Sequence, residues 1–199
     1  MVMDLLNRAA RRDSRPEDAR DCLEAAVRVA GDRIWVYRNA ARIYREVLDD
    51  RAAARRVLDQ LSPLTCIEWR LAAAAWVELG ELADATRCLE RGTSNARIAS
   101  DVCVMAMGYL DAGFADEARL LVDGAAVSLT ARGSECWAVA NMYRDAFRDV
   151  GLARATLDRG VRDATAVADL VMLAHALAAH DVEPDALAEC LTLDEHHAS

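Results

Sequence analysis

The side chains with which this chain could do covalent or metal chemistry are few and widely spaced. No two of its six cysteines are close enough to form a CxxC pair, so the sequence has no zinc-site spacing. We expect reduced core thiols in a cytoplasmic protein. Two of the four histidines, His196 and His197, follow Glu195 near the C-terminus, where they could scavenge a metal. The cysteines are Cys22, Cys66, Cys88, Cys103, Cys136 and Cys190.

A catalytic site would need a nucleophile with a base, or a metal cluster. Cys103 could face His175 as a thiol–imidazole pair, but two of the repeats identified below separate them, so we expect no hydrogen bond. All 24 basic residues are Arg, which removes the phosphate-binding Lys of Walker motifs and every Schiff-base mechanism. We therefore predict a non-enzymatic protein without metal or cofactor. A thiol- or metal-dependent enzyme is the less favoured alternative.

Charge and hydropathy narrow the possible partners. Asp and Glu number 33 against 24 Arg, and the net charge of −9 disfavours binding to DNA or RNA phosphates, including base recognition by helical repeats. The absence of Lys is typical of a GC-rich, bacterial-like codon usage. No stretch approaches 18 uncharged apolar residues, and the N-terminus has no apolar leader. We expect neither a membrane span nor a signal peptide, and we expect a cytoplasmic location.

The composition favours helices. Hydrophobic residues make up 54% of the 199 residues and are mostly Ala, Leu and Val, with 5% aromatics and three prolines. Such residues favour closely packed helices over strands. The length is compatible with one domain that needs no disulfide or metal to hold its core. The sequence therefore predicts an all-α protein.

An internal repeat of about 33 residues organises the chain. An Ala followed three residues later by a large side chain occurs five times, at steps of 32, 33, 34 and 34 residues. These pairs are Ala41/Tyr44, Ala73/Trp76, Ala106/Tyr109, Ala140/Tyr143 and Ala174/Leu177. A second Ala and then a bulkier residue four positions on follow each pair, at Ala54/Leu58, Ala85/Leu89, Ala118/Val122, Ala153/Leu157 and Ala186/Cys190.

Each repeat predicts a helical hairpin. In the first half the apolar residues form one stripe at helical spacing, as at Trp69, Ala73 and Trp76. A break then precedes the small Ala that begins a second stripe. Gly80 and Gly113 mark this break in two repeats, and we expect Leu48, Phe147 and Asp181 to replace the glycine in the others.

Helix starts are marked by boundary residues. Ser14 to Glu17 and Thr65 to Glu68 both have the form of a capping box, and Pro184 fits the first turn of a helix. Leu5 to Ala9 and Ala19 to Leu23 indicate a degenerate hairpin ahead of the first full repeat.

This order of large, small and aromatic residues, followed by Ala and a bulky residue at a period near 34, resembles the tetratricopeptide repeat family from Asp32 to Leu191. The family's closing proline is absent from most repeats, and a half-a-tetratricopeptide array is an alternative. The resemblance implies a right-handed α-solenoid of about five tandem helix-turn-helix repeats. We expect one domain over residues 1–199, with a capping hairpin at 1–31, repeats at 32–193 and a frayed tail at 194–199.

The resemblance also implies that first helices line a concave groove. Its fifteen expected positions contain five Arg and no acid, where composition alone would give about 2.5 acids. Arg can hold a carboxylate by two parallel hydrogen bonds, and Met can bury an apolar side chain. The alternative is that these Arg residues are solvated or paired with carboxylates such as Glu46. The groove candidates are Arg38, Arg42, Arg45, Arg70, Met107, Trp137, Asn141 and Arg144.

Four carboxylates form a second series, each two residues after the large side chain. They are expected to lie at least a helix-packing distance apart, about 8–10 Å, which is too far to share one metal. We expect solvated or ion-paired carboxylates instead. The carboxylate clamp of chaperone-binding relatives is not reproduced, because Leu71, Ser100 and Val104 occupy its places. The series is Glu46, Glu78, Asp111 and Asp145.

The pattern as a whole favours a non-catalytic scaffold or adaptor that binds an acidic, partly hydrophobic protein segment in the groove. The alternative is a small acidic inhibitor or assembly chaperone that acts through its outer surface. Neither the identity of the partner nor the oligomeric state follows from the sequence.

Overall fold

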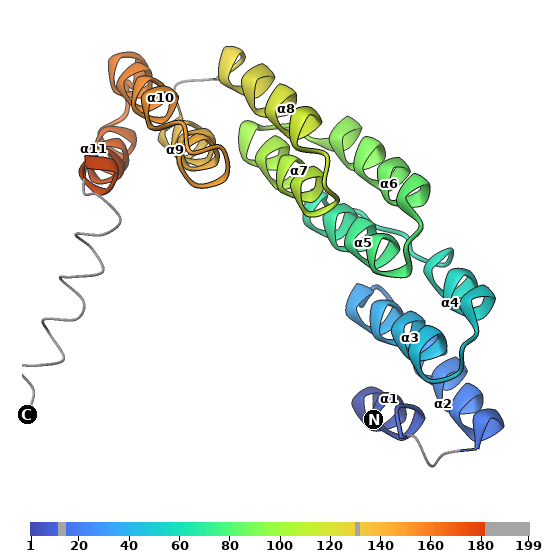
Figure 1. The fold of residues 1–199 in the computed structure, drawn as a ribbon. Coiled ribbons are helices and arrows are strands. Elements are labelled where there is room, and N and C mark those ends of the chain that lie inside the picture. The colour runs from blue at the N-terminus through green and yellow to red at the C-terminus, as the bar shows by residue number, and fades with distance from the viewer. Residues whose placement is uncertain (12–14, 130–131, 182–199) are drawn as a thin grey trace, which may run out of the picture. The chain divides into compact units, whose positions relative to one another are not determined.

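The computed structural model describes residues 1–11, 15–129 and 132–181 (Figure 1). Helices make up 79% of these residues and none of them lies in a strand, so the all-α prediction is confirmed. The helices are α1 Val2–Ala9, α2 Pro16–Arg28, α3 Ile34–Glu46, α4 Arg51–Leu58, α5 Cys66–Leu79, α6 Leu82–Asn95, α7 Ala99–Asp111, α8 Ala115–Val127, α9 Gly133–Asn141, the π-helical segment η1 Met142–Ala146, α10 Val150–Asp163 and α11 Val167–Asp181.

The contacts between helices define two compact units. Unit 1 comprises Met1–Arg97 with Val104–Ala118, and unit 2 comprises Ile98–Cys103 with Arg119–Ser199. In unit 1, α1, α3 and α5 form one layer and α2, α4 and α6 form the other, with hairpin contacts within each successive pair (Figure 1). In unit 2, α9 packs against both α10 and α11, and α10 packs against α11. The expected hairpin at the N-terminus is present as α1 and α2.

The repeated small residues are buried where the sequence placed them. Ala54, Ala85, Ala118 and Ala153 have no exposed surface, which lets the second helices approach the first helices closely. Leu58, Leu89, Val122 and Leu157 are likewise buried. The fifth repeat differs: α11 buries Leu173 and Ala176, while Ala174 is exposed. Ala186, Cys190 and Pro184 lie outside the described residues.

The hairpin turns share one backbone hydrogen bond and one left-handed residue. In the turns before α4, α6, α8 and α10, the N–H of the residue before the second helix donates to the carbonyl of the large first-helix residue, and the residue preceding that donor has a positive φ. The hydrogen bonds are Asp50 to Tyr44 at 2.8 Å, Glu81 to Trp76 at 2.9 Å, Phe114 to Tyr109 at 2.8 Å and Asp149 to Tyr143 at 2.8 Å. The left-handed residues are Asp49, Gly80, Gly113 and Arg148.

The prediction that Leu48 and Phe147 replace the turn glycine is therefore wrong by one position, because Asp49 and Arg148 have the positive φ. Leu48 and Phe147 are extra residues of a longer turn: their N–H groups donate five residues back, to the carbonyls of Ile43 and Met142. In the second case the first helix ends in the π-helical segment η1, the usual way in which a helix absorbs one inserted residue. The inserted residue could not be predicted from the sequence pattern, because the insertion leaves the spacing of the buried residues within each helix unchanged. Asp181 still belongs to α11.

Replacing Arg148 by Gly is expected to stabilise the protein by about 1 kcal/mol, because a side chain at φ 56° pays a steric cost that Gly avoids. Asp49→Gly, at φ 50°, should gain less, since Asp tolerates the left-handed region better than Arg does. Urea unfolding of both variants measures the difference. A lower urea midpoint for Arg148→Gly would contradict the strain that we assign to this turn.

One of the two predicted capping boxes is confirmed. Thr65 Oγ1 accepts a hydrogen bond from the Glu68 N–H at 3.2 Å, and the Glu68 carboxylate accepts from the Thr65 N–H at 2.9 Å. The N–H groups of Leu64 and Thr65 both donate to the Glu68 carboxylate, and these hydrogen bonds lower the pKa of Glu68. At the other predicted box, α2 begins at Pro16 with Arg15 as its N-cap, and Ser14 lies outside the described residues.

Candidate functional site

The eight groove candidates fall into two sets. Five of them belong to unit 1, with three Arg on α3, one on α5 and Met107 on α7. There, Arg70 Nη1 lies 3.7 Å from the sulfur of Met107. The other three, Trp137, Asn141 and Arg144, belong to α9 and η1 of unit 2.

Two of the candidate arginines join successive repeats by ion pairs. Arg38 binds both oxygens of Glu78 through Nε at 3.0 Å and adds a contact through Nη2. This hydrogen bond lowers the pKa of Glu78 and raises the pKa of Arg38. Arg70 makes the corresponding pair with Asp111, at 2.9 Å. In both pairs the Arg lies six residues before the large side chain of its own repeat. The acid lies two residues after the large side chain of the next repeat.

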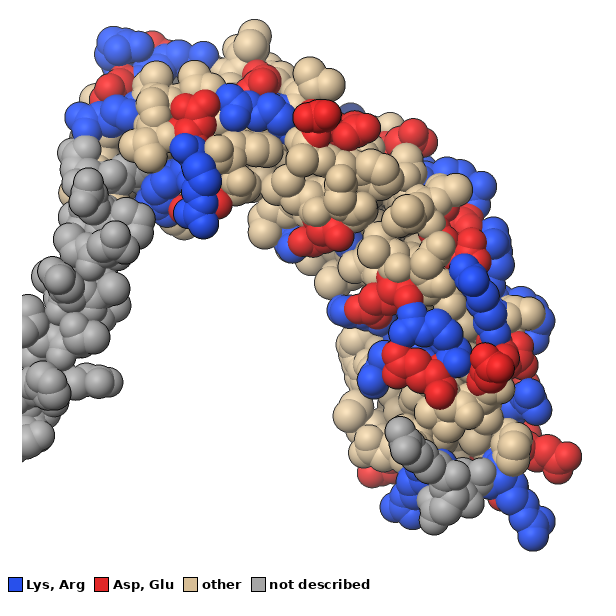
Figure 2. All heavy atoms as spheres, viewed as in Figure 1, with Lys and Arg blue, Asp and Glu red and all other residues tan. Residues whose placement is uncertain are grey.

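The remaining candidate arginines pair with carboxylates of their own repeat. Arg45 contacts Glu46 at 2.5 Å and Arg42 contacts it at 3.8 Å, while Arg144 contacts Asp145 at 2.6 Å. Each acid of the predicted series therefore meets at least one candidate Arg. The face offers neutralised pairs in place of a free cationic patch. Figure 2 shows this mixing, with blue and red atoms side by side over the part of the surface where Figure 1 places α3 and α4.

The space among these arginines in unit 1 is small. The cavity between Arg38, Arg42, Arg45 and Glu78 measures about 10 Å³. This is roughly the volume that one water molecule requires. This cavity is too small for a side chain of a partner, so a partner that binds this face would have to contact its outer surface.

Exposed apolar side chains lie on the same layer of helices. Trp35 of α3 and Ile67 of α5 occupy equivalent repeat positions, nine residues before the large side chain. Leu71 follows Ile67 by one helical turn. With Met107 these side chains form what we call the first-helix surface. Their exposed fractions are 39% for Trp35, 61% for Ile67, 40% for Leu71 and 39% for Met107. Of these four residues, only Met107 was among the predicted groove candidates. Ile67 and Leu71 form an apolar i, i+4 pair outside the core stripe, and this spacing could have predicted the exposed surface of α5.

A second set of Arg residues connects the second helices of successive repeats. In each case an Arg directly after the small buried Ala binds the acidic N-cap of the next second helix. Arg20 contacts Asp50 at 3.4 Å, Arg55 contacts Glu81 at 3.3 Å and Arg119 contacts Asp149 at 3.0 Å. Asp50 and Asp149 also accept hydrogen bonds from helix N–H groups, which is the main reason why their pKa values are lowered.

Two of these linking arginines also lie over an aromatic ring of the next first helix. Arg55 lies 5.7 Å from the centroid of Trp76, and Arg119 lies 5.1 Å from that of Tyr143. The α6–α8 step lacks the pair altogether: Thr86 and Phe114 occupy the two positions, and neither side chain can form an ion pair. At this step the Arg and its acidic partner are therefore both replaced, as expected if neither stabilises the contact without the other.

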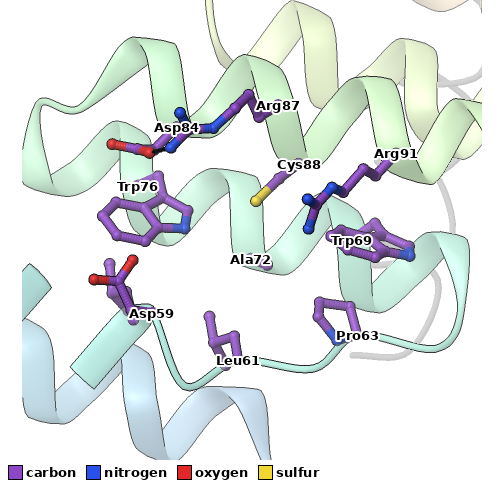
Figure 3. Close-up of a pocket in the computed structure, with 11 residues that line it drawn as sticks. Asp59, Leu61, Pro63, Trp69, Ala72, Trp76, Asp84, Arg87, Cys88 and Arg91 are labelled. Atoms are coloured by element: carbon purple, nitrogen blue, oxygen red, sulfur yellow. Dashed lines mark ion pairs between the residues drawn. The ribbon is translucent and has the colours of Figure 1, made fainter. Parts of the chain in front are cut away.

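A pocket of about 220 Å³ lies beside α5 and α6, on the side of α4 and the loop that follows it (Figure 3). Its apolar lining includes Leu61, Trp69 and Trp76. The sequence did not predict this pocket. Beside it, the buried Asp84 pairs with Arg87 and, at 2.8 Å, with Arg55 of α4. This network connects α4 to α6 at one end of the pocket.

Of the thiol and the imidazole that could form a catalytic pair, one is buried and the other is exposed. Cys103 is buried, and its burial raises the pKa of the thiol to about 12. His175 is exposed, and no hydrogen bond joins it to Cys103 among the described residues. The side chains of His180, His196 and His197 lie outside the described part.

Within residues 1–11, 15–129 and 132–181, no cluster of three or more His, Cys, Asp or Glu side chains could hold a metal ion. None of the helices in that part is both long enough and apolar enough to cross a membrane.

Comparison with known proteins identifies no family for this chain, so its class rests on its own structure. No protein-family model, no curated protein and no solved structure matches the chain. The chain is thus an all-α protein whose helices pack against their neighbours, compatible with a helical repeat. Its resemblance to tetratricopeptide repeats rests on the residue pattern alone.

Proposed function

We propose that the chain is a non-catalytic interaction module, built as a right-handed array of helical hairpins, whose first-helix surface binds an apolar segment of a partner protein. The observation that supports this most is the row of exposed apolar side chains on helices α3, α5 and α7 of unit 1. Trp and Met are enriched in the cores of protein interfaces, where they supply large contact areas. An isolated exposed Leu would need no explanation, but Trp35 and Ile67 occupy equivalent repeat positions and Leu71 lies one helical turn from Ile67, which favours a shared contact.

The arginine pairs next to this surface determine which segments it accepts. Because Arg38 and Arg70 already bind Glu78 and Asp111, an acidic partner must share or displace those carboxylates. Exposed pairs of this kind contribute about 0–1 kcal/mol each, so displacement is inexpensive. Apolar contact therefore supplies the affinity, and acidic flanks of the partner add selectivity by pairing with the Arg forks.

The test is selection of binding peptides from a displayed random library on the full chain, followed by affinity measurements with variants. Leu71→Ser should weaken the selected peptides about tenfold, because roughly 1.5–3 kcal/mol accompanies the burial of one Leu side chain. Trp35→Ser should have a similar or larger effect. Selected sequences should combine apolar residues with Asp or Glu.

Leu82→Ser is the matched control, since Leu82 is an exposed Leu of α6 in the other layer of unit 1. It should leave peptide affinity unchanged. Circular dichroism must show the same helix content in all variants. Peptides that bind Leu71→Ser and Trp35→Ser as tightly as the wild type would exclude the first-helix surface as the binding site.

A further inference from the structure

The pocket beside α5 and α6 exists because α4 is short. The second helices α6 and α10 continue six residues beyond their buried Leu89 and Leu157, whereas α4 ends at its equivalent residue, Leu58. Pro63 prevents further helix, since it disfavours helical geometry in the preceding residue. The missing turns leave a space beside α5, where Trp69 is half-buried and Trp76 is buried.

The walls of the pocket suit one apolar or aromatic group. Trp69 and Trp76 of α5 lie along it, Leu61 and Pro63 come from the loop after α4, and the Cys88 sulfur points into the space (Figure 3). A volume of about 220 Å³ is smaller than the roughly 300–1,000 Å³ of sites for drug-sized ligands. It is large enough for a single ring or branched side chain.

One end of the pocket rim carries a positive charge and the other end carries a negative charge. Arg91 lies by Trp69, and Asp59 lies by Trp76 (Figure 3). Arg87 is engaged by the buried Asp84, but no ion pair of Arg91 is found within the described part of the chain. An anionic group is therefore attracted to the Arg91 end and repelled from the Asp59 end.

We propose that this pocket binds a carboxylate that carries one apolar or aromatic group, with the group between Trp69 and Trp76 and the carboxylate on Arg91. The C-terminal residue of a peptide and a small free carboxylic acid share this chemistry. The site is separate from the first-helix surface and does not depend on its function. The Arg55 contacts with Glu81 and Asp84 hold α4 against α6, so the pocket is preformed.

The experiment titrates the full chain with three probes: a short peptide ending in Phe with a free carboxylate, the same peptide with a C-terminal amide, and 3-phenylpropanoate. Calorimetry gives the affinities, and peptide-resolved mass spectrometry follows alkylation of Cys88. Both carboxylates should bind, the amide should bind about tenfold more weakly, and bound ligand should slow alkylation of Cys88. If the peptide binds and 3-phenylpropanoate does not, the source is a peptide terminus; the reverse identifies a small acid.

Three variants test the assigned contacts. Arg91→Gln should weaken the carboxylate probes about tenfold, and Asp59→Asn should strengthen them severalfold. Arg162→Gln removes a charge from α10, far along the chain, and should change nothing beyond the effect of net charge. Cys88→Phe should fill the pocket and abolish binding; should it not fold, Arg91→Gln still tests the proposal. Equal affinity for carboxylate and amide, or unchanged affinity in Arg91→Gln, overturns it.

Discussion

Gly160→Ala is expected to destabilise the protein by about 1–3 kcal/mol, although Ala is the better helix former by roughly 1 kcal/mol. A Cβ at Gly160 would lie 2.9 Å from the sulfur and 3.0 Å from the Cβ of Cys136, and 3.2 Å from Leu173. Cys136 belongs to the first helix of the same repeat and Leu173 to the next one. Because the Cβ of Cys136 cannot move without its backbone, the helices must separate.

Gly124→Ala is the matched control for this prediction. Gly124 also lies inside a second helix, α8, but a Cβ there would meet nothing within 4 Å. This variant should gain about 0.5–1 kcal/mol from helix propensity alone. Thermal and urea unfolding of both proteins measures the two changes. A Gly160→Ala protein as stable as Gly124→Ala would show that the close approach at α10 is not tightly packed.

The same close approach occurs in unit 1, at the equivalent position of the sequence pattern. A Cβ at Gly92 would lie 2.7 Å from the Cβ of Trp69 in the same repeat and would contact Met105 of the next first helix. Gly92 and Gly160 each follow the buried Leu of their second helix by three residues. That regularity is visible in the sequence, but glycine within a helical pattern predicts only lower helix propensity. Which two side chains approach it depends on packing.

The sequence predicted the buried positions because small and large residues recur with helical spacing, and tight packing leaves few alternatives for them. It failed at the turn lengths. The pattern predicts Leu48 and Phe147 in place of the turn glycine, whereas Asp49 and Arg148 occupy the left-handed position of that glycine. An inserted residue that is absorbed by a wider turn leaves the buried pattern intact, so hydrophobic periodicity carries no information about it.

At the candidate site the residue types could be predicted from the sequence, but their pairing could not. The arginines of α3 and α5 were expected to present a basic groove, with ion pairing to nearby acids as the alternative. The structure shows the pairing, and Arg38 and Arg70 reach acids about 40 residues away in the next repeat. Such distant partners depend on how neighbouring helices are offset, which a repeat period alone does not fix.

Arg119→Met is expected to lower the free energy of unfolding by about 1–2 kcal/mol at neutral pH, because it removes two ion pairs and two ring contacts while keeping an apolar stem. Arg119 lies 3.0 Å from Asp149 and 3.1 Å from Asp123, and it stacks over both Tyr143 and Phe147 at 5.1 Å. Its loss also leaves Asp149 and Asp123 without the cation between them. Arg162→Met, on the exposed side of α10, is the control and should change stability by only a few tenths of a kcal/mol.

The effect of Arg119→Met should depend on pH in a defined direction. The pKa of Asp149 is lowered from 3.8, mainly by the Leu152 N–H and then by Arg119, so the folded protein favours the charged carboxylate. A lowered pKa contributes stability that is complete above the unfolded value and is lost as the pH falls through the folded value. Urea unfolding should therefore show a constant gap between wild type and variant from pH 7 to about 5, and a narrowing gap below 3.8. A gap that stays constant to the lowest pH at which the protein folds would assign the contribution of Arg119 to its contacts with Tyr143 and Phe147 instead.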